Sequence, residues 1–202
     1  MSDRDLVRLY WPFELRPAFD ALFAIDDALA AIVASSTQPA LGAVRLAWWR
    51  EALERLDRAD PPAEPRLRAA ATELLPRGVS GDALAGLEDG WAALLDEHPD
   101  FTRIARRGQR LFVIGARLLG SDADVAAPGR LFAAVQAARL GQVALRQATL
   151  PSAPPAPKRA RPLTALAALA ARDIRRGGPP YEPEATPGRA WTLLRHRWTG
   201  RL

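Results

Sequence analysis

The stretch PAFDALFAIDDALAAIVA, residues 17–34, decides how this chain folds. It is almost entirely apolar and opens with a proline, which suits the first turn of a helix because that position needs no backbone N–H donor. The stretch therefore predicts a helix. Two adjacent aspartates, Asp26 and Asp27, lie in its middle. They are either metal ligands or one polar edge of an ordinary helix that meets arginines from elsewhere, and this choice decides whether the chain is an enzyme.

The rest of the sequence also predicts helices. It contains no sustained alternation of apolar and polar residues and few β-branched residues, which argues against a sheet. We expect helices over residues 2–10, 17–34, 39–58, 66–75, 80–95, 100–119, 128–149, 163–176 and 187–199. The predicted fold is all-α in three parts: a helical domain over residues 1–149, a proline-rich connector over 150–162, and two basic C-terminal helices over 163–202 that we expect to be loosely tethered.

The composition excludes several classes of site. The chain has no cysteine, and its two histidines, His98 and His196, are far apart in the sequence, which excludes disulfides and a His/Cys metal cluster. The N-terminus carries acidic residues in place of an apolar region, so no signal peptide is expected. No apolar run approaches the ~20 residues that a membrane-spanning helix needs. We therefore expect a cytoplasmic protein.

The charge is segregated along the chain. Residues 1–102 contain 18 acidic and 10 basic residues, whereas residues 103–202 contain 5 acidic and 18 basic residues. The two halves can attract each other within one fold, or the basic half can meet an anionic surface such as lipid, nucleic acid or diphosphate. No recognised nucleic-acid-binding motif accompanies the basic half, so we expect no nucleic-acid partner.

Two blocks near the N-terminus carry a resemblance to a known family. The first is WPFELRPAFDALFAI, residues 11–25, and the second is Gly-x-x-Arg-Leu-x-Trp-Trp, residues 42–49. Their spacing resembles the squalene/phytoene synthase family of head-to-head prenyl synthases, with weaker likeness at residues 87–95 and 137–141. The resemblance covers residues 3–147. It implies an isoprenoid-synthase-like helical bundle, here abbreviated at its C-terminus.

In that family, two aspartate-rich motifs on facing helices hold the Mg²⁺ ions that clamp the diphosphate of an isoprenoid substrate. Alignment of the first block places the first motif on Ala30, Ala31 and Ala34, four residues beyond the aspartate pair of this chain. The second motif is missing too, because the segment after Leu140–Gly141 contains no acidic residue. Both motifs are therefore degenerate in this sequence.

The resemblance is closest to a non-catalytic branch of the family, which includes the mitochondrial assembly factor for respiratory complex I. It implies a catalytically degenerate protein that acts as a binding or assembly factor for a protein partner, such as a subunit of a respiratory complex, and needs no cofactor. The alternative is a Mg²⁺-dependent prenyl transferase of isoprenoid biosynthesis that acts on an isoprenoid diphosphate. In that case Asp26 and Asp27 would be the metal ligands.

Several arginines and tryptophans are candidates for binding a ligand or an anion. The helix over residues 100–119 carries a stripe of arginines that either binds an anion, such as a diphosphate or a phospholipid headgroup, or lies in solvent and pairs with the acidic half. Trp48 and Trp49 face different directions on one helix, so one is expected in the core and the other at a groove or partner surface. The candidate set is Arg16, Arg45, Trp48, Trp49, Arg103, Arg107 and Arg110.

The C-terminal segment PGRAWTLLRHRWTGRL, residues 187–202, predicts an amphipathic helix. Trp191, Leu194 and Trp198 recur at spacings of three and four, and arginines occupy other positions. This stripe either lies on the anionic inner face of the cytoplasmic membrane or docks the helix onto the bundle. The first alternative makes the chain a peripheral membrane protein.

Overall fold

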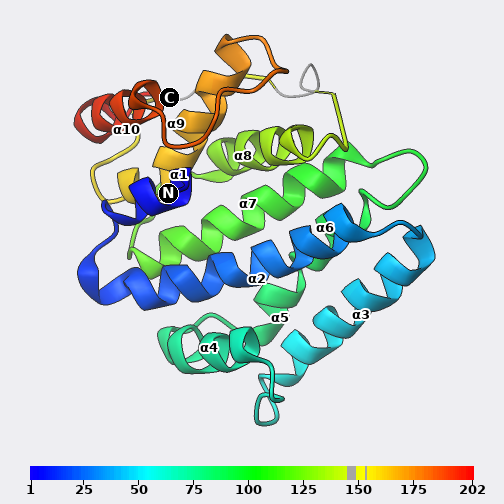
Figure 1. Cartoon of the computed structure of the whole chain (residues 1–202). Helices are drawn as coiled ribbons and strands as arrows, with labels where there is room; N and C mark the ends of the chain where they lie inside the picture. The colour runs from blue at the N-terminus through cyan, green and yellow to red at the C-terminus, as the bar shows by residue number, and fades with distance from the viewer. Residues whose placement is uncertain (145–148, 153) are drawn as a thin grey trace.

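The computed structural model describes residues 1–144, 149–152 and 154–202, and these residues form an all-α fold without a β-strand, as predicted (Figure 1). The helices are α1 (Asp3–Arg8), α2 (Arg16–Ser35), α3 (Pro39–Arg55), α4 (Pro65–Glu73), α5 (Gly81–Ala85), α6 (Glu88–Ala92), α7 (Phe101–Leu118), α8 (Ala126–Arg139), α9 (Arg161–Arg175) and α10 (Pro187–Thr199). Two short 3₁₀ helices, η1 (Phe13–Leu15) and η2 (Leu75–Arg77), precede α2 and α5.

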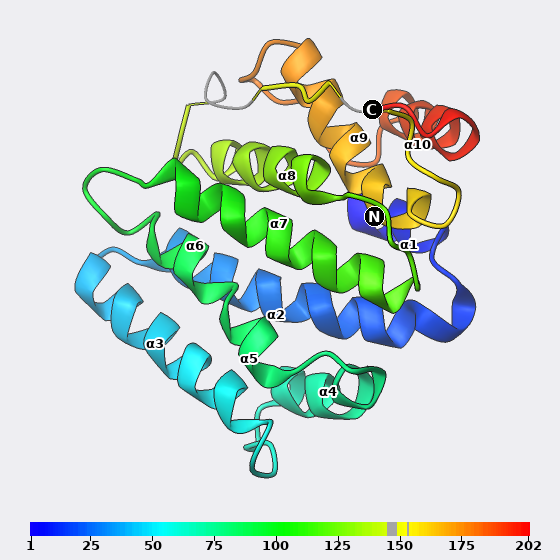
Figure 2. The same ribbon diagram turned by 180° about the vertical axis from the view of Figure 1, so that it is seen from behind.

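The bundle is arranged around α2 and α7. Figure 1 shows these two helices running through the middle, with α3, α4 and α5 below them and α8 to α10 above, and Figure 2 shows from behind that α6 lies beside α2 and α7. One large hydrophobic core extends through these layers and includes Leu22 of α2, Phe112 of α7 and Leu166 of α9, and a smaller cluster that includes Leu131 and Ala171 lies between α8 and α9. Each such side chain stabilises the folded protein by about 1.5–3 kcal/mol when it is fully buried. This burial holds the helices together around one centre.

The closest helix pair in the bundle is α7 with α8, and two glycines make this approach possible. A Cβ atom added to Gly108 would overlap the backbone carbonyl of Gly129, and one added to Gly129 would overlap the carbonyl of Gly108. Any side chain at either position would therefore push the backbones apart. This crossing holds α8, and the polar side chains that it carries, against the centre of the bundle.

Two predicted helices differ from the structure. The helix expected over residues 80–95 is two short helices, α5 and α6, because the carbonyl of Gly86 accepts a hydrogen bond from Arg110 (2.6 Å) and the N–H of Leu87 bonds to Leu84, three residues back. The helix expected to reach Thr149 ends at Arg139, where Gly141 takes a positive φ of 73°. The rest of that prediction falls partly on residues 145–148, which lie outside the described residues.

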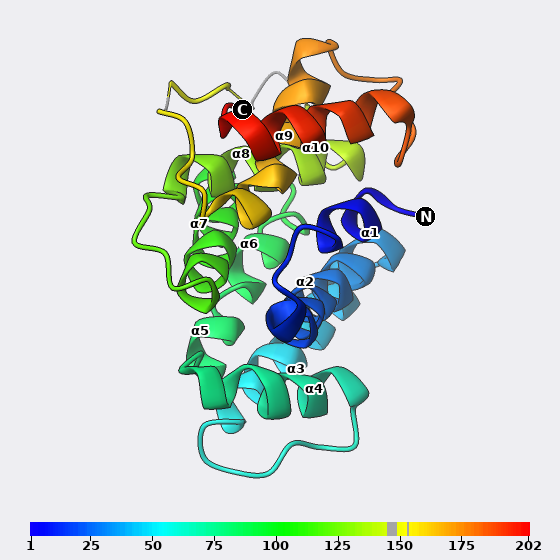
Figure 3. The same cartoon turned by 90° about the vertical axis from the view of Figure 1, so that its left-hand side faces the viewer.

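The C-terminal helices are attached more firmly than the sequence predicts. Helix α9 is buried along most of its length and belongs to the main core through Leu163, Leu166 and Leu169, so the expectation of loose tethering is wrong for this helix. Figure 3 shows α10 lying across α9, with α1 and both chain ends on this side of the molecule. The boundaries of the three predicted parts stay a prediction. Among the described helices, none is both long and apolar enough to cross a membrane.

Candidate functional site

The two adjacent aspartates of α2 have different surroundings. Asp26 is fully buried inside the bundle, whereas the side chain of Asp27 is half exposed and pairs with Arg4 of α1. This difference follows from helix geometry, because consecutive residues point about 100° apart around the axis. The two carboxylates therefore do not face one common point, and each has to be considered as a separate group.

Asp26 is the centre of a polar network in the core. One carboxylate oxygen, Oδ1, accepts hydrogen bonds from Nη1 of Arg107 (2.6 Å) and from the indole Nε1 of Trp91 (2.8 Å). The Gln136 amide lies 3.4 Å from Oδ2 and also accepts a hydrogen bond from Nη2 of Arg107 (2.9 Å). The four residues belong to α2, α6, α7 and α8, so the network joins the helices at the centre of the fold.

The packing around Arg107 explains how a charged side chain is held inside the bundle. Its guanidinium lies over the indole ring of Trp91, 3.9 Å from the ring centroid, and its side chain has no exposed surface. Gly90 of α6 leaves the space for this approach, because a Cβ at that position would overlap the Arg107 side chain. The carboxylate of Asp26 thus neutralises the charge of Arg107, and the ring of Trp91 and the amide oxygen of Gln136 stabilise the guanidinium further.

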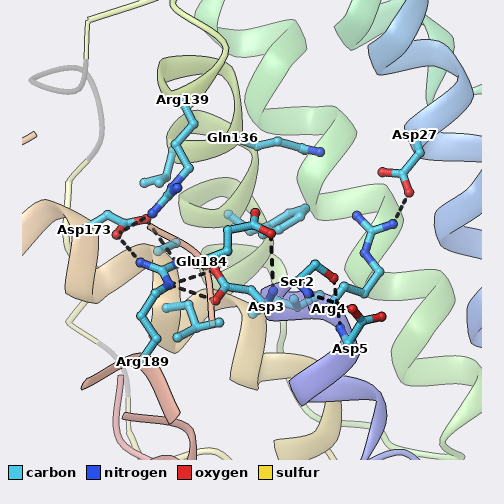
Figure 4. A pocket seen from close by; sticks show the side chains of 15 residues that line it. Ser2, Asp3, Arg4, Asp5, Asp27, Gln136, Arg139, Asp173, Glu184 and Arg189 are labelled. Carbon is cyan, nitrogen blue, oxygen red and sulfur yellow. Dashed lines mark hydrogen bonds and ion pairs between the residues drawn. The ribbon is translucent and has the colours of Figure 1, made fainter. Parts of the chain in front are cut away.

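A cavity of about 460 Å³ lies beside this network, between α1, α2, α8 and α9. Figure 4 shows Asp27 and Arg4 on one side of it and a chain of paired charges on the other. The rest of its wall is apolar and comes from α8 and α9, including Val135 and Leu166. The cavity therefore combines a charged end with an apolar wall, as sites for amphiphilic small molecules do.

The paired charges on the far side of the cavity connect four helices. Arg189 of α10 donates to Asp3 of α1 (2.7 and 2.9 Å) and to Asp173 of α9 (2.5 Å), and Asp173 also accepts from Arg139 of α8 (2.7 Å). Burial disfavours the charge of Arg189, but the hydrogen bonds that it donates to Asp3 and Asp173 and the negative charges of these carboxylates outweigh this and raise its pKa. The cluster is a structural clamp between the two ends of the chain.

The charges around the cavity determine what it can bind. Five carboxylates, of Asp3, Asp5, Asp27, Asp173 and Glu184, and three guanidinium groups, of Arg4, Arg139 and Arg189, line it. Most of these groups neutralise one another within the protein. No set of three or more Asp, Glu or His side chains in the described residues is close enough to hold a metal ion. Asp27 is the one predicted metal-ligand candidate that lies at this cavity.

The candidate anion-binding arginines do not converge on one site. Arg103 donates to Asp89 (2.8 Å) and Asp96 (2.9 Å), Arg107 is held by Asp26, and Arg110 donates to a backbone carbonyl. None of the three lines the cavity beside Asp27, whereas Arg110 lines a separate cavity of about 460 Å³ together with Arg117. Their guanidinium groups are used to attach α7 to the acidic half of the chain, which is the alternative to anion binding that the charge segregation predicts.

The remaining candidates, on α2 and α3, also lie away from the cavity beside Asp27. Arg16 contacts the carbonyl of Trp11 (3.4 Å), and Arg45 is exposed on α3. Trp49 is buried, whereas Trp48 is 49% exposed, so the two tryptophans divide between core and surface as expected from their adjacent positions. Trp48 continues an apolar stripe on the outer face of α3 with Leu41 and Val44, both well exposed.

The C-terminal helix packs against the bundle by the face opposite to its tryptophan stripe, so of the two alternatives that the sequence left open for this stripe, docking onto the bundle is excluded for Trp191 and Trp198. Leu193 and His196 of α10 are buried against the bundle, while Trp191 and Trp198 are 61% and 67% exposed and Leu194 is half buried. The tryptophan stripe therefore does not attach α10 to the bundle. It faces outward, which leaves it available for contact with another surface.

The charged clamp of Asp3, Asp173, Arg139 and Arg189 was not predicted from the sequence. The signal that was available is the lone acidic residue Asp173 within an otherwise apolar and basic helix, since a buried carboxylate needs a cationic partner.

Comparisons with protein-family models, with curated proteins and with solved structures give no match.

Proposed function

We propose that this chain is a catalytically degenerate relative of the squalene/phytoene synthases and acts as a binding or assembly factor for a protein partner. The proposal combines the likeness of residues 11–25 and 42–49 to that family with one structural observation, the burial of Asp26 in an ion pair with Arg107. It includes an isoprenoid-synthase-like origin for the all-α bundle. The partner class that the resemblance implies is a subunit of a respiratory complex.

The surroundings of Asp26 support a structural role over metal binding. Its carboxylate already accepts hydrogen bonds from Arg107 and Trp91 and lies against Gln136. A Mg²⁺ ion at this carboxylate would displace the guanidinium of Arg107 and leave a buried cation without a counterion. Breaking a buried pair in this way costs about 3–5 kcal/mol, which opposes metal binding at this position.

The outer face of α3 supports a role in binding a protein. Leu41, Val44 and Trp48 lie at spacings of three and four on this helix and are all well exposed. Tryptophan is enriched among the residues that dominate protein–protein binding energy. Exposure of an apolar stripe to water is unfavourable in an isolated protein, and contiguous exposed apolar surface often marks an interaction site. This stripe is the surface that we assign to the partner in the proposed role.

Titration calorimetry with farnesyl diphosphate, with and without Mg²⁺, tests the proposal. The degenerate role predicts no Mg²⁺-dependent heat with the wild-type protein. Asp27→Asn is the informative variant, because Asp27 is half exposed and its replacement leaves the core intact. Asp60→Asn, at an exposed residue in the loop before α4, is the matched control.

A second candidate function rests on Asp27. This carboxylate lines the 460 Å³ cavity, whose apolar wall is formed by α8 and α9, so a Mg²⁺-dependent prenyl transferase remains the alternative. It predicts micromolar, Mg²⁺-dependent binding of the diphosphate that Asp27→Asn abolishes and Asp60→Asn retains. That outcome would overturn the degenerate role and make product analysis the next experiment.

A further inference from the structure

Helix α10 presents two faces of different character. The inward face carries Thr192, Leu193 and His196, all buried against the bundle. The outward face carries Trp191 and Trp198, which are the two most exposed tryptophans in the described residues, with Leu194 between them. Tryptophan combines an apolar ring with a polar N–H group, and side chains of this type favour the boundary between water and the lipid headgroups of a membrane.

The surface around this helix is basic. Neither residues 149–172 nor residues 185–202 contain an acidic residue, and Lys158, Arg159, Arg195, Arg197 and Arg201 are exposed. The two segments lie side by side, since the N–H of Ala156 donates to the carbonyl of Gly200 (2.8 Å). This part of the surface therefore has a positive field that attracts anions.

A second cavity, of about 430 Å³, opens between these segments and the end of α1. Three cationic side chains, Lys158, Arg161 and Arg197, line it, and no carboxylate does. The aromatic rings of Tyr10 and Trp198 form part of its wall, and the rest is largely apolar. The cavity beside Asp27 has five carboxylates in its lining, so the two cavities differ in the sign of charge that they favour.

Two of the three cations of this cavity, Arg161 and Arg197, contact neighbouring groups of the fold. Arg161 donates to the carbonyls of Ala156 (3.0 Å), Arg197 (2.9 Å) and Trp198 (2.9 Å), which fixes its guanidinium at the C-terminal end of α10. The guanidinium of Arg197 lies 5.0 Å from the ring centroid of Tyr10. Their hydrogen bonds and ring contacts go to neutral groups, so their charges stay available to an anionic ligand.

His196 also lines the cavity but is already occupied. Its Nε2 lies 2.9 Å from the hydroxyl of Thr164, and its Nδ1 lies 2.9 Å from the carbonyl oxygen of Arg201. A carbonyl oxygen can only accept, so Nδ1 carries the proton. The single hydroxyl proton of Thr164 is shared between Nε2 and the carbonyl oxygen of Ala160, which lies 3.2 Å from the hydroxyl. Both nitrogens therefore serve the attachment of α10, and the anion-binding capacity of the cavity comes from Lys158, Arg161 and Arg197 alone.

We propose that this face of the protein docks on a membrane that contains anionic phospholipid. Trp191, Leu194 and Trp198 enter the boundary between headgroups and acyl chains, and the cavity with its three cations receives a lipid phosphate group. Trp198 belongs both to the outward stripe and to the cavity wall, so the apolar and the anionic part of one lipid are recognised next to each other. The inference is independent of the role proposed above.

The test is co-sedimentation of the whole chain with phosphatidylcholine vesicles, with and without about 30 mol% phosphatidylglycerol. This anionic lipid gives the vesicles the negative surface potential that attracts basic protein surfaces. We expect binding to the anionic vesicles only, and weaker binding as salt is raised. Two double variants, Trp191→Ser with Trp198→Ser and Lys158→Glu with Arg197→Glu, should each lower the partition coefficient at least tenfold. All four side chains are exposed, so these variants should fold.

The matched control replaces an aromatic and a basic residue on another face. Phe101→Ser with Arg58→Glu removes an exposed aromatic side chain and an exposed arginine outside α10 and its neighbouring segment and should leave vesicle binding unchanged. Equal loss in this control, undiminished binding of the α10 variants, or no binding by the wild-type chain would each overturn the proposal. Saturable binding of soluble glycerol phosphate in the absence of vesicle binding would also overturn it, because it would identify a site for a free anion.

Discussion

Asp26 and Arg107 lie 81 positions apart in the sequence and form an ion pair of 2.6 Å in which neither side chain has exposed surface. The pair attaches α2 to α7 at the centre of the bundle. A carboxylate and a guanidinium in such a position are stable only together, because each alone would be a buried charge without a counterion. This mutual dependence gives the first prediction.

Arg107→Met leaves Asp26 buried without its cation, and we expect the free energy of unfolding to fall by about 3–5 kcal/mol. The double variant Asp26→Leu with Arg107→Met removes both charges and should recover most of this loss. Arg4→Met is the matched control, because it breaks the more exposed pair with Asp27 and should cost no more than about 1 kcal/mol. Urea denaturation measures all four proteins, and a double variant as unstable as Arg107→Met would contradict the prediction.

Gly108→Ala should destabilise the protein because its methyl group would overlap the carbonyl of Gly129 in the crossing helix. We expect the free energy of unfolding to fall by about 1–3 kcal/mol, in spite of the better helix propensity of alanine. Gly86→Ala is the control, since its nearest neighbour is the flexible end of Arg110. Thermal denaturation should separate the two variants, and equal melting temperatures would argue against a backbone contact between α7 and α8.

The stability of the protein should decrease in mild acid because of His196. Burial lowers the pKa of this side chain below its usual value of 6.5, with a small opposing contribution from its hydrogen bond to the Arg201 carbonyl. The unfolded chain therefore binds a proton as the pH falls below about 6.5 while the folded protein does not, and the free energy of unfolding decreases over this range.

The measurement is the free energy of unfolding at pH 7.5 and at pH 5.5. His196→Gln should show a smaller decrease between these two values than the wild-type protein. His98→Gln should behave like the wild type, because His98 is exposed. If the two variants lose the same amount of stability on acidification, the buried histidine does not cause the effect.

The local features of the fold could be predicted from the sequence. The prolines at the starts of α2, α3 and α10, and the caps Ser2, Asp100 and Thr186, place helix ends near their observed positions. The break between α5 and α6 could not be predicted, because it depends on a hydrogen bond from Arg110 of another helix to the Gly86 carbonyl. Local propensity determines where a helix can begin, whereas a tertiary contact determines where α5 ends.

The environment of the candidate residues was predictable only in part. The segregation of charge indicated that arginines of the second half would meet acids of the first, and Arg107 with Asp26 and Arg189 with Asp3 do so. The sequence did not show which of the two adjacent aspartates is buried, because both lie within the same apolar run. It also left open whether the Trp191 stripe of α10 faces the bundle or another surface, since periodicity identifies two faces of a helix but not which one has a partner.

The pairing of Asp3 with Arg189 spans 186 positions and has a consequence for the order of events during synthesis. The ribosome adds residues at about 5–20 per second, so Asp3 emerges several seconds or more before its counterion exists. During this interval Asp3 lacks the cation of Arg189, although α1 can already pair with α2 through Arg4 with Asp27 and Arg8 with Asp20. The nascent chain can assemble its inner helices early, but it acquires its final form only when α10 arrives to join the first helix.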